Sequence, residues 1–134
     1  MLKDYDIVVS GGGLTGVAAA IAAKRNGAKD VLLIERYGFL GGMATSGLVH
    51  PFMSFFKARE PFERKHQLIF GIFQEILDNL KELGGLEKVS FFDAEVMKLV
   101  LNRMVVENDV DILLHTYVAD VQKNKENYIE SIKH

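Results

Sequence analysis

Three glycines and one glutamate near the N-terminus have the types and spacing needed to hold phosphate and ribose groups. Gly11, Gly13 and Gly16 form the pattern G-x-G-x-x-G, and Glu35 follows 19 residues after the last of them. Glycines let backbone N–H groups approach a phosphate, and a carboxylate at this distance can accept hydrogen bonds from ribose hydroxyls. The pattern predicts a dinucleotide site. The charge of Glu35 argues against a ribose 2′-phosphate, hence against NADP, and the adjacent Arg36 weakens that argument only slightly.

The segments around these residues predict the elements that would position them. Tyr5–Ser10 and Asp30–Glu35 are short apolar runs typical of buried strands. Leu14–Asn26 predicts a helix, and Gly27 is a natural place for it to stop. We therefore expect one β-α-β unit with parallel, right-handed connectivity.

Each glycine of the pattern has a separate predicted role in this unit. Gly11 would make the tight turn after the strand, Gly13 would leave room for a pyrophosphate, and Gly16 would let the helix pack closely. Leu14 and Thr15 begin the helix, whose N–H groups and positive dipole end favour phosphate oxygens. The alternative is a tight turn in a doubly wound sheet that binds no ligand.

A second glycine cluster lies between residues 38 and 47 and bears on which dinucleotide would bind. It contains Gly38, Gly41, Gly42 and Gly47, with Thr45 and Ser46 among them. Such a loop can lie along an extended ligand and offer N–H and hydroxyl donors to it. The next predicted strand starts only near Val110, later than in a simple NAD-binding unit. These features favour FAD, and a simple NAD-binding unit is the alternative.

The remaining segments complete an α/β fold with a parallel sheet flanked by helices and the start of an antiparallel β extension. A helix is predicted from Gln67 to about Leu83. Its apolar residues fall at helical spacing and make one stripe, namely Leu68, Ile69, Ile72, Phe73, Ile76, Leu77, Leu80 and Leu83. Asp93 can cap a further helix with four residues on its inner face, namely Val96, Leu99, Val100 and Met104. Asp111–His115 predicts a third parallel strand. Two extended segments would form the antiparallel part, Tyr117–Gln122 and Tyr128–Lys133.

Three segments resemble a known family. They are "ERYGFLGGMATSGLV", "FFDAEVMKLVLNRMV" and "VDILLHTYVADV", at residues 35–49, 91–105 and 110–121. Together with the first glycine loop they resemble the N-terminal part of bacterial FAD-dependent oxidoreductases, a group that includes succinate dehydrogenase-like, glutathione reductase-like and heterodisulfide-reductase-like flavoproteins. The resemblance covers essentially the whole chain and is most specific over the first 47 residues. It implies a Rossmann-like FAD/NAD(P)-binding domain over residues 1–134.

The resemblance also implies roles for individual residues. Gly11, Gly13 and Gly16 would hold the FAD pyrophosphate, and Glu35 would hold the adenosine ribose, with Arg36 beside it. A second set would run beside the phosphate and the flavin: Gly41, Gly42, Met43, Ala44 and Thr45. Val118 would lie near the adenine through its backbone.

The family implies more than this chain contains. Its members are several times longer, return to the FAD domain with a T-G-D motif, and carry a substrate domain. We therefore expect an N-terminal fragment, a truncated product, or a half that needs a partner chain. The expected function is an FAD-binding module for hydride or electron transfer, inactive alone, with substrate and catalytic residues unassigned. The alternative is a non-catalytic half that assembles with a separate chain.

Composition narrows the function classes. The net charge of −2 gives no indication of nucleic acid or an anionic membrane as partner. The chain has no cysteine, which excludes a disulfide framework and fits a cytoplasmic location. The uncharged run Ile7–Ala23 is shorter than the ~20 apolar residues of a membrane span.

The four histidines show no metal-ligand spacing, although His50 could lie near a flavin. A homo-oligomer is possible.

Overall fold

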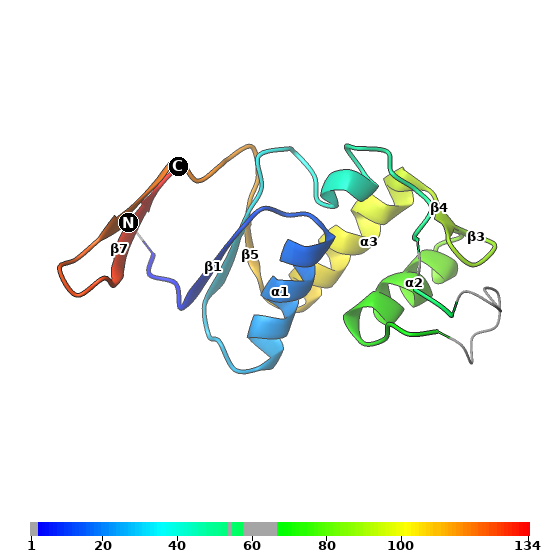
Figure 1. Ribbon diagram of the computed structural model, residues 1–134, viewed down its shortest axis with the longest axis horizontal. Coiled ribbons are helices and arrows are strands. Elements are labelled where there is room, and N and C mark those ends of the chain that lie inside the picture. The colour runs from blue at the N-terminus through cyan, green and yellow to red at the C-terminus, as the bar shows by residue number, and fades with distance from the viewer. Residues whose placement is uncertain (1–2, 54, 58–66) are drawn as a thin grey trace.

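A parallel three-stranded sheet forms the centre of the fold. The computed structural model describes residues 3–53, 55–57 and 67–134. The strands β1 (Ile7–Ser10), β2 (Val31–Ile34) and β5 (Asp111–Leu113) lie in the order β1-β2-β5, and both pairs are parallel. Helix α1 (Leu14–Arg25) connects β1 to β2. The predicted β-α-β unit is confirmed (Figure 1).

Two further helices extend this unit. Helix α3 (Ala94–Glu107) lies beside α1, and α2 (Ile72–Glu82) packs against α3 (Figure 1). The inner faces of the helices and the middle of β2 form one apolar core, in which Val17, Ile21 and Leu33 are fully buried. Helix α1 packs on β1, β2 and α3, and this packing fixes its position relative to the sheet.

A short antiparallel hairpin, which the sequence did not predict, precedes α3. Its strands are β3 (Leu86–Glu87) and β4 (Phe91–Phe92). Phe92 is buried and packs on Phe52, with ring centroids 4.4 Å apart. Phe52 also meets Phe73 of α2 at 5.0 Å. The hairpin therefore joins the chain after the second glycine cluster to α2 through an aromatic cluster.

The predicted helix beginning at Gln67 starts later than the apolar pattern indicates. Gly71 has φ +67°, which interrupts helical geometry just before α2. Leu68 instead donates its N–H to the carbonyl of Phe55, at 2.8 Å, so this stretch is extended. Leu68 and Ile69 are exposed and lie before the helix, so their assignment to its apolar stripe was wrong. The mixed-charge segment before them, residues 58–66, lies outside the described residues.

Helix α3 begins as predicted. The carboxylate of Asp93 accepts hydrogen bonds from the N–H groups of Glu95 and Val96, at 2.7 and 3.1 Å. Val100 and Met104 are buried, as expected. Leu99 is 56% exposed, so its predicted place on the inner face was wrong. The buried residues of α3 are spaced three and four apart, namely Met97, Val100, Leu101, Met104 and Val105, and Leu99 lies outside that stripe.

The antiparallel extension is a hairpin of β6 (Asp120–Lys123) and β7 (Ile129–Lys133). It stands apart from the helices at one end of the molecule (Figure 1). Most of its side chains are exposed, including Ile129 at 63%. In the part of the chain that the structure describes, no helix is long and apolar enough to cross a membrane.

Candidate dinucleotide-binding site

The first glycine loop makes the turn from β1 into α1. Gly11 has φ +103°, a conformation that favours glycine, and its N–H donates to the carbonyl of Ile34 at the end of β2. A Cβ on Gly16 would overlap the carbonyl oxygen of Gly11. Only glycine at position 16 therefore lets the first turn of α1 pack against the loop. The turn and close packing follow the predicted pattern.

Gly13 differs from Gly16 because it faces open space. An added Cβ at Gly13 would meet no atom within 4 Å, and its φ of −67° is accessible to any residue. Gly13 is the N-cap of α1, without a side chain capping the helix and without an acidic residue in the first turn. The first N–H groups of a helix lack acceptors within it and carry partial positive charge. This open, uncapped start fits an anionic group such as a pyrophosphate.

The second glycine loop lies directly against the first. Gly41 forms a parallel bridge with Gly13, and its N–H donates to the carbonyl of Gly12 at 2.8 Å. Gly41 has φ +114°, and the short 3-10 helix η1 (Gly42–Ala44) follows it. A Cβ on Gly42 would lie 3.1 Å from the Cα of Gly13. The two loops therefore form one continuous backbone surface at the carboxyl end of the sheet.

A cleft of about 610 Å³ opens over this surface. It brings together eight of the residues predicted from the sequence: Gly11, Gly13, Leu14, Thr15, Gly16, Gly41, Met43 and Ala44. Three further lining residues were not predicted, namely Val9, Ser10 and Ala19. These three extend the cleft along β1 and the adjacent face of α1. The alternation of β1 residues between two faces was the available signal for Val9.

Four other predicted residues lie outside the cleft lining. The hydroxyl of Thr45 is buried and donates to the carbonyl of Leu40 at 2.8 Å, so it supports the loop from beneath. Arg36 lies over the ring of Tyr37, 4.7 Å from its centroid. Gly42 belongs to η1, and Val118 lies half-buried between β5 and β6. Contact of these residues with a cofactor stays a prediction.

Glu35 is buried just beyond β2 and is also outside the cleft lining. It is 5% exposed, and its two carboxylate oxygens accept hydrogen bonds from backbone N–H groups. Oε2 accepts from Gly12 at 2.6 Å, and Oε1 accepts from Tyr37 at 2.9 Å. Sequence reasoning assigned Glu35 to a ribose and missed its bond to Gly12. The sequence signal for that contact is the glycine at position 12, between Gly11 and Gly13, because a larger residue there would crowd Glu35.

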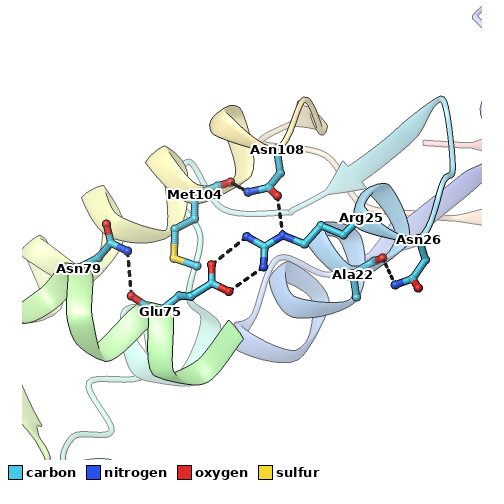
Figure 2. A network of polar contacts seen from close by, with 7 residues as sticks. All are labelled: Ala22, Arg25, Asn26, Glu75, Asn79, Met104 and Asn108. Carbon is cyan, nitrogen blue, oxygen red and sulfur yellow. Dashed lines mark hydrogen bonds and ion pairs between the residues drawn. The ribbon is translucent and has the colours of Figure 1, made fainter. Parts of the chain in front are cut away.

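The carboxyl end of α1 is anchored by a polar network, shown in Figure 2. The guanidinium of Arg25 donates to both carboxylate oxygens of Glu75 on α2, at 2.7 and 2.8 Å, and to Asn108 beyond α3 at 2.8 Å. The hydrogen bonds from Arg25 lower the pKa of Glu75. The network fixes α1 relative to α2 and α3, and hence the direction of its N-terminus.

Other charged residues lie away from the cleft. Lys3 pairs with Asp30 and Asp111 at the opposite end of the sheet, at 3.0 and 2.6 Å, and this raises its pKa. His50 is exposed, with its ring 5.6 Å from that of Phe92, and does not line the cleft. Among the described residues no group of three His, Cys, Asp or Glu side chains is placed to hold a metal ion.

Known proteins share a sequence segment or the fold with this chain. A 40-residue segment is 45% identical to the acrylate reductase flavoprotein subunit of Shewanella woodyi, covering 30% of this chain and 8% of that protein. The L-proline dehydrogenase of P. horikoshii has a TM-score of 0.60 at 17% identity, covering 99% of this chain and 50% of that one. THI4 of Thermovibrio ammonificans has a TM-score of 0.57 at 17% identity, covering 96% and 46%. The chain thus spans half or less of each.

The structural similarity shows that the fold is the Rossmann-like one predicted. The family assignment comes from a second comparison, in which the model of a family described as FAD dependent oxidoreductase matches residues 6–134. That match covers nearly the whole chain, including both glycine loops and the hairpin of β6 and β7. The chain therefore belongs to the FAD dependent oxidoreductase family, whose cofactor is FAD.

Proposed function

We propose that this chain holds FAD with the pyrophosphate against the start of α1 and beneath the second glycine loop. The observation that carries the proposal is the open space over Gly13, next to a helix start that no side chain caps. Gly41, Met43 and Ala44 complete the cleft and would continue along the ligand towards the flavin. Glu35 and Arg36 would lie at the adenosine end, with the backbone of Val118 near the adenine.

The function supported best is that of the FAD-binding module of an oxidoreductase. Bound FAD supplies acceptance and donation of a hydride or of electrons. The residues of this chain would bind and orient the cofactor and fix its phosphates. The substrate is unassigned, since the described residues that line the cleft include no acidic, basic or histidine side chain.

We also propose that the active protein includes a companion segment that pairs with β1, supplied by a longer chain or by a separate one. Among the described residues β1 is an edge strand of the parallel sheet, and Ile7 on it is 40% exposed. Unpaired edges of this kind are ready to accept another strand. The cleft also extends beyond the glycine loops to Val9, Ser10 and Ala19. A strand beside β1 would cover that extension and leave the glycine loops to the cofactor.

Two alternatives make different predictions. A simple NAD-binding unit predicts NAD affinity without retained flavin. Support for FAD comes from the second glycine loop, which lies against the first through the Gly13–Gly41 bridge and so lengthens the backbone surface available to a ligand. A non-catalytic half predicts cofactor binding that never supports turnover, even with a companion chain. The cytoplasmic location stays a prediction from the absence of cysteine.

The test is a set of binding titrations of the 134-residue chain with FAD, NAD and NADP. Calorimetry measures binding of all three, and flavin fluorescence also measures binding of FAD. The proposal predicts saturable FAD binding that is stronger than NAD binding, with NADP weakest. Preference for NAD would support the simple NAD-binding unit. Failure of all three to bind would contradict the proposal for this chain.

A further inference from the structure

A continuous set of hydrogen bonds joins the buried carboxylate of Glu35 to both glycine loops. Oε2 of Glu35 accepts the N–H of Gly12 at 2.6 Å, and the carbonyl of the same glycine accepts the N–H of Gly41 at 2.8 Å. Oε1 accepts the N–H of Tyr37 at 2.9 Å. We propose that Glu35 is a positioning residue that fixes the second glycine loop against the first, in addition to any contact with a ribose. The consequence for ligand binding rests on the proposed function.

The burial of Glu35 explains why these bonds are firm. A carboxylate that is only 5% exposed must be matched by donors, because an unmatched buried charge is strongly unfavourable. Both donors that the structure gives are backbone N–H groups, and bonds from N–H to a carboxylate are shorter and stronger than neutral ones. Loss of the charge at position 35 therefore acts directly on the backbone of both loops.

Close packing around Gly12 limits how far the loop could adjust. A Cβ on Gly12 would lie 2.6 Å from Cδ2 of Leu40 and 2.9 Å from Cβ of Glu35. Leu40 is buried, and its carbonyl accepts the hydroxyl of Thr45. The Gly12 peptide is thus enclosed by Glu35 on one side and by the base of the second loop on the other. A change in the Glu35–Gly12 bond is transmitted to Gly41.

The contact with Gly12 does not use the whole carboxylate. An ionised carboxylate has about four lone-pair sites, and the two backbone donors occupy two of them. Glu35 can accept ribose hydroxyls while it keeps Gly12 in place. Two routes from Glu35 to ligand affinity follow: one through the ribose hydroxyls and one through the shape of the loops.

Two ligands separate these routes. ADP carries the ribose diol, whereas 2′,3′-dideoxy-ADP lacks it and keeps the pyrophosphate. Both are titrated by calorimetry into the wild-type chain, into Glu35→Gln, and into Glu126→Gln, which removes the charge of an exposed glutamate in the turn before β7. The positioning role predicts that Glu35→Gln weakens dideoxy-ADP by about tenfold, the loss of roughly one charge-assisted hydrogen bond, and that Glu126→Gln leaves it unchanged. Weakened ADP binding with wild-type dideoxy-ADP binding would overturn the proposal.

Amide hydrogen exchange tests the positioning role without a ligand. The proposal predicts slow exchange at Gly12 and Gly41 in the wild-type chain, and at least tenfold faster exchange at Gly41 in Glu35→Gln. Fast exchange at both amides in the wild type would overturn it, whether or not the variant folds, and so would unchanged exchange at Gly41 in a folded variant. If the wild type binds neither nucleotide, the FAD titration decides the proposed function, and the exchange data alone decide the role of Glu35.

Discussion

Gly13 and Gly41 are bridged in parallel although they lie 28 positions apart in the sequence. The bridge places the turn after β1 and the loop after β2 on one surface at the carboxyl end of the sheet. Ligands of open α/β sheets bind at this end of the strands. The relationship between these two glycines therefore supports the proposal that FAD lies at this end of the sheet, and the following predictions test it.

Gly13→Val is expected to abolish FAD binding without unfolding the protein. The valine side chain would enter the open space over the loop, where the pyrophosphate is proposed to lie, and the φ of −67° does not require glycine. FAD titration and thermal unfolding of the same sample measure both effects. Wild-type FAD affinity in this variant would show that the phosphates lie elsewhere.

Gly16→Ala is the contrasting variant, because its main expected effect is a loss of folding stability and not a direct block of the ligand. Its Cβ would overlap the carbonyl oxygen of Gly11, so α1 would have to move away from the loop. Overpacking of this kind costs about 1–3 kcal/mol. Urea unfolding followed by circular dichroism measures the loss. An unchanged midpoint would mean that α1 and the loop are less closely packed than the structure shows.

Thr45→Val is expected to loosen the second glycine loop. The variant keeps the shape of the side chain but leaves the carbonyl of Leu40 without the hydroxyl that it accepts at 2.8 Å. A buried group left unmatched costs about 1–3 kcal/mol. Thr45→Ser keeps the hydroxyl but loses a buried methyl group, so it measures the cost of packing alone. A wild-type urea midpoint for the valine variant would contradict a role for this bond.

Glu75→Gln is expected to make stability less sensitive to acid. The paired guanidinium of Arg25 lowers the pKa of Glu75 below its ordinary value of 4.5, so the pair stabilises the fold above that pH. That contribution is lost as the pH falls below 4.5 towards the lower pKa of the folded state. Because both side chains are about 40% exposed, the contribution is below about 1 kcal/mol.

The measurement is urea unfolding of the wild type and of Glu75→Gln between pH 7 and pH 3. The difference in free energy of unfolding between the two is expected to shrink towards the acid end, and at high salt. Glu87→Gln, a change at an exposed glutamate of β3, controls for loss of a charge. A difference that is constant across this pH range would contradict the assigned pairing.

Local chemistry made the first part of the site predictable. A turn after a strand needs glycine at position 11, and close packing of the helix needs it at position 16. Glycine at position 13 leaves the helix start open to a ligand, so the spacing of the three residues indicates the geometry of the loop. Asp93 is a similar case, since a cap depends on residues two and three positions away. The β-α-β unit and the antiparallel hairpin of β6 and β7 also follow from short-range sequence patterns.

Contacts made at long range explain what the sequence did not predict. Leu68 and Ile69 match a helical apolar stripe, yet the pairing of Leu68 with Phe55 and the conformation of Gly71 hold them outside α2. The strands β3 and β4 have two residues each, too few for any periodicity. The bond from Gly12 to Glu35 depends on how the ends of β1 and β2 meet.

The most direct test of the account is a visible absorption titration of the wild-type chain and of Gly13→Val with FAD, after removal of any flavin retained on purification. The account predicts a saturable change in the flavin spectrum for the wild type, absent in a Gly13→Val protein that remains folded under the same conditions. Equal binding by both proteins, or no binding by the folded wild type, would contradict the proposal that the two glycine loops hold FAD.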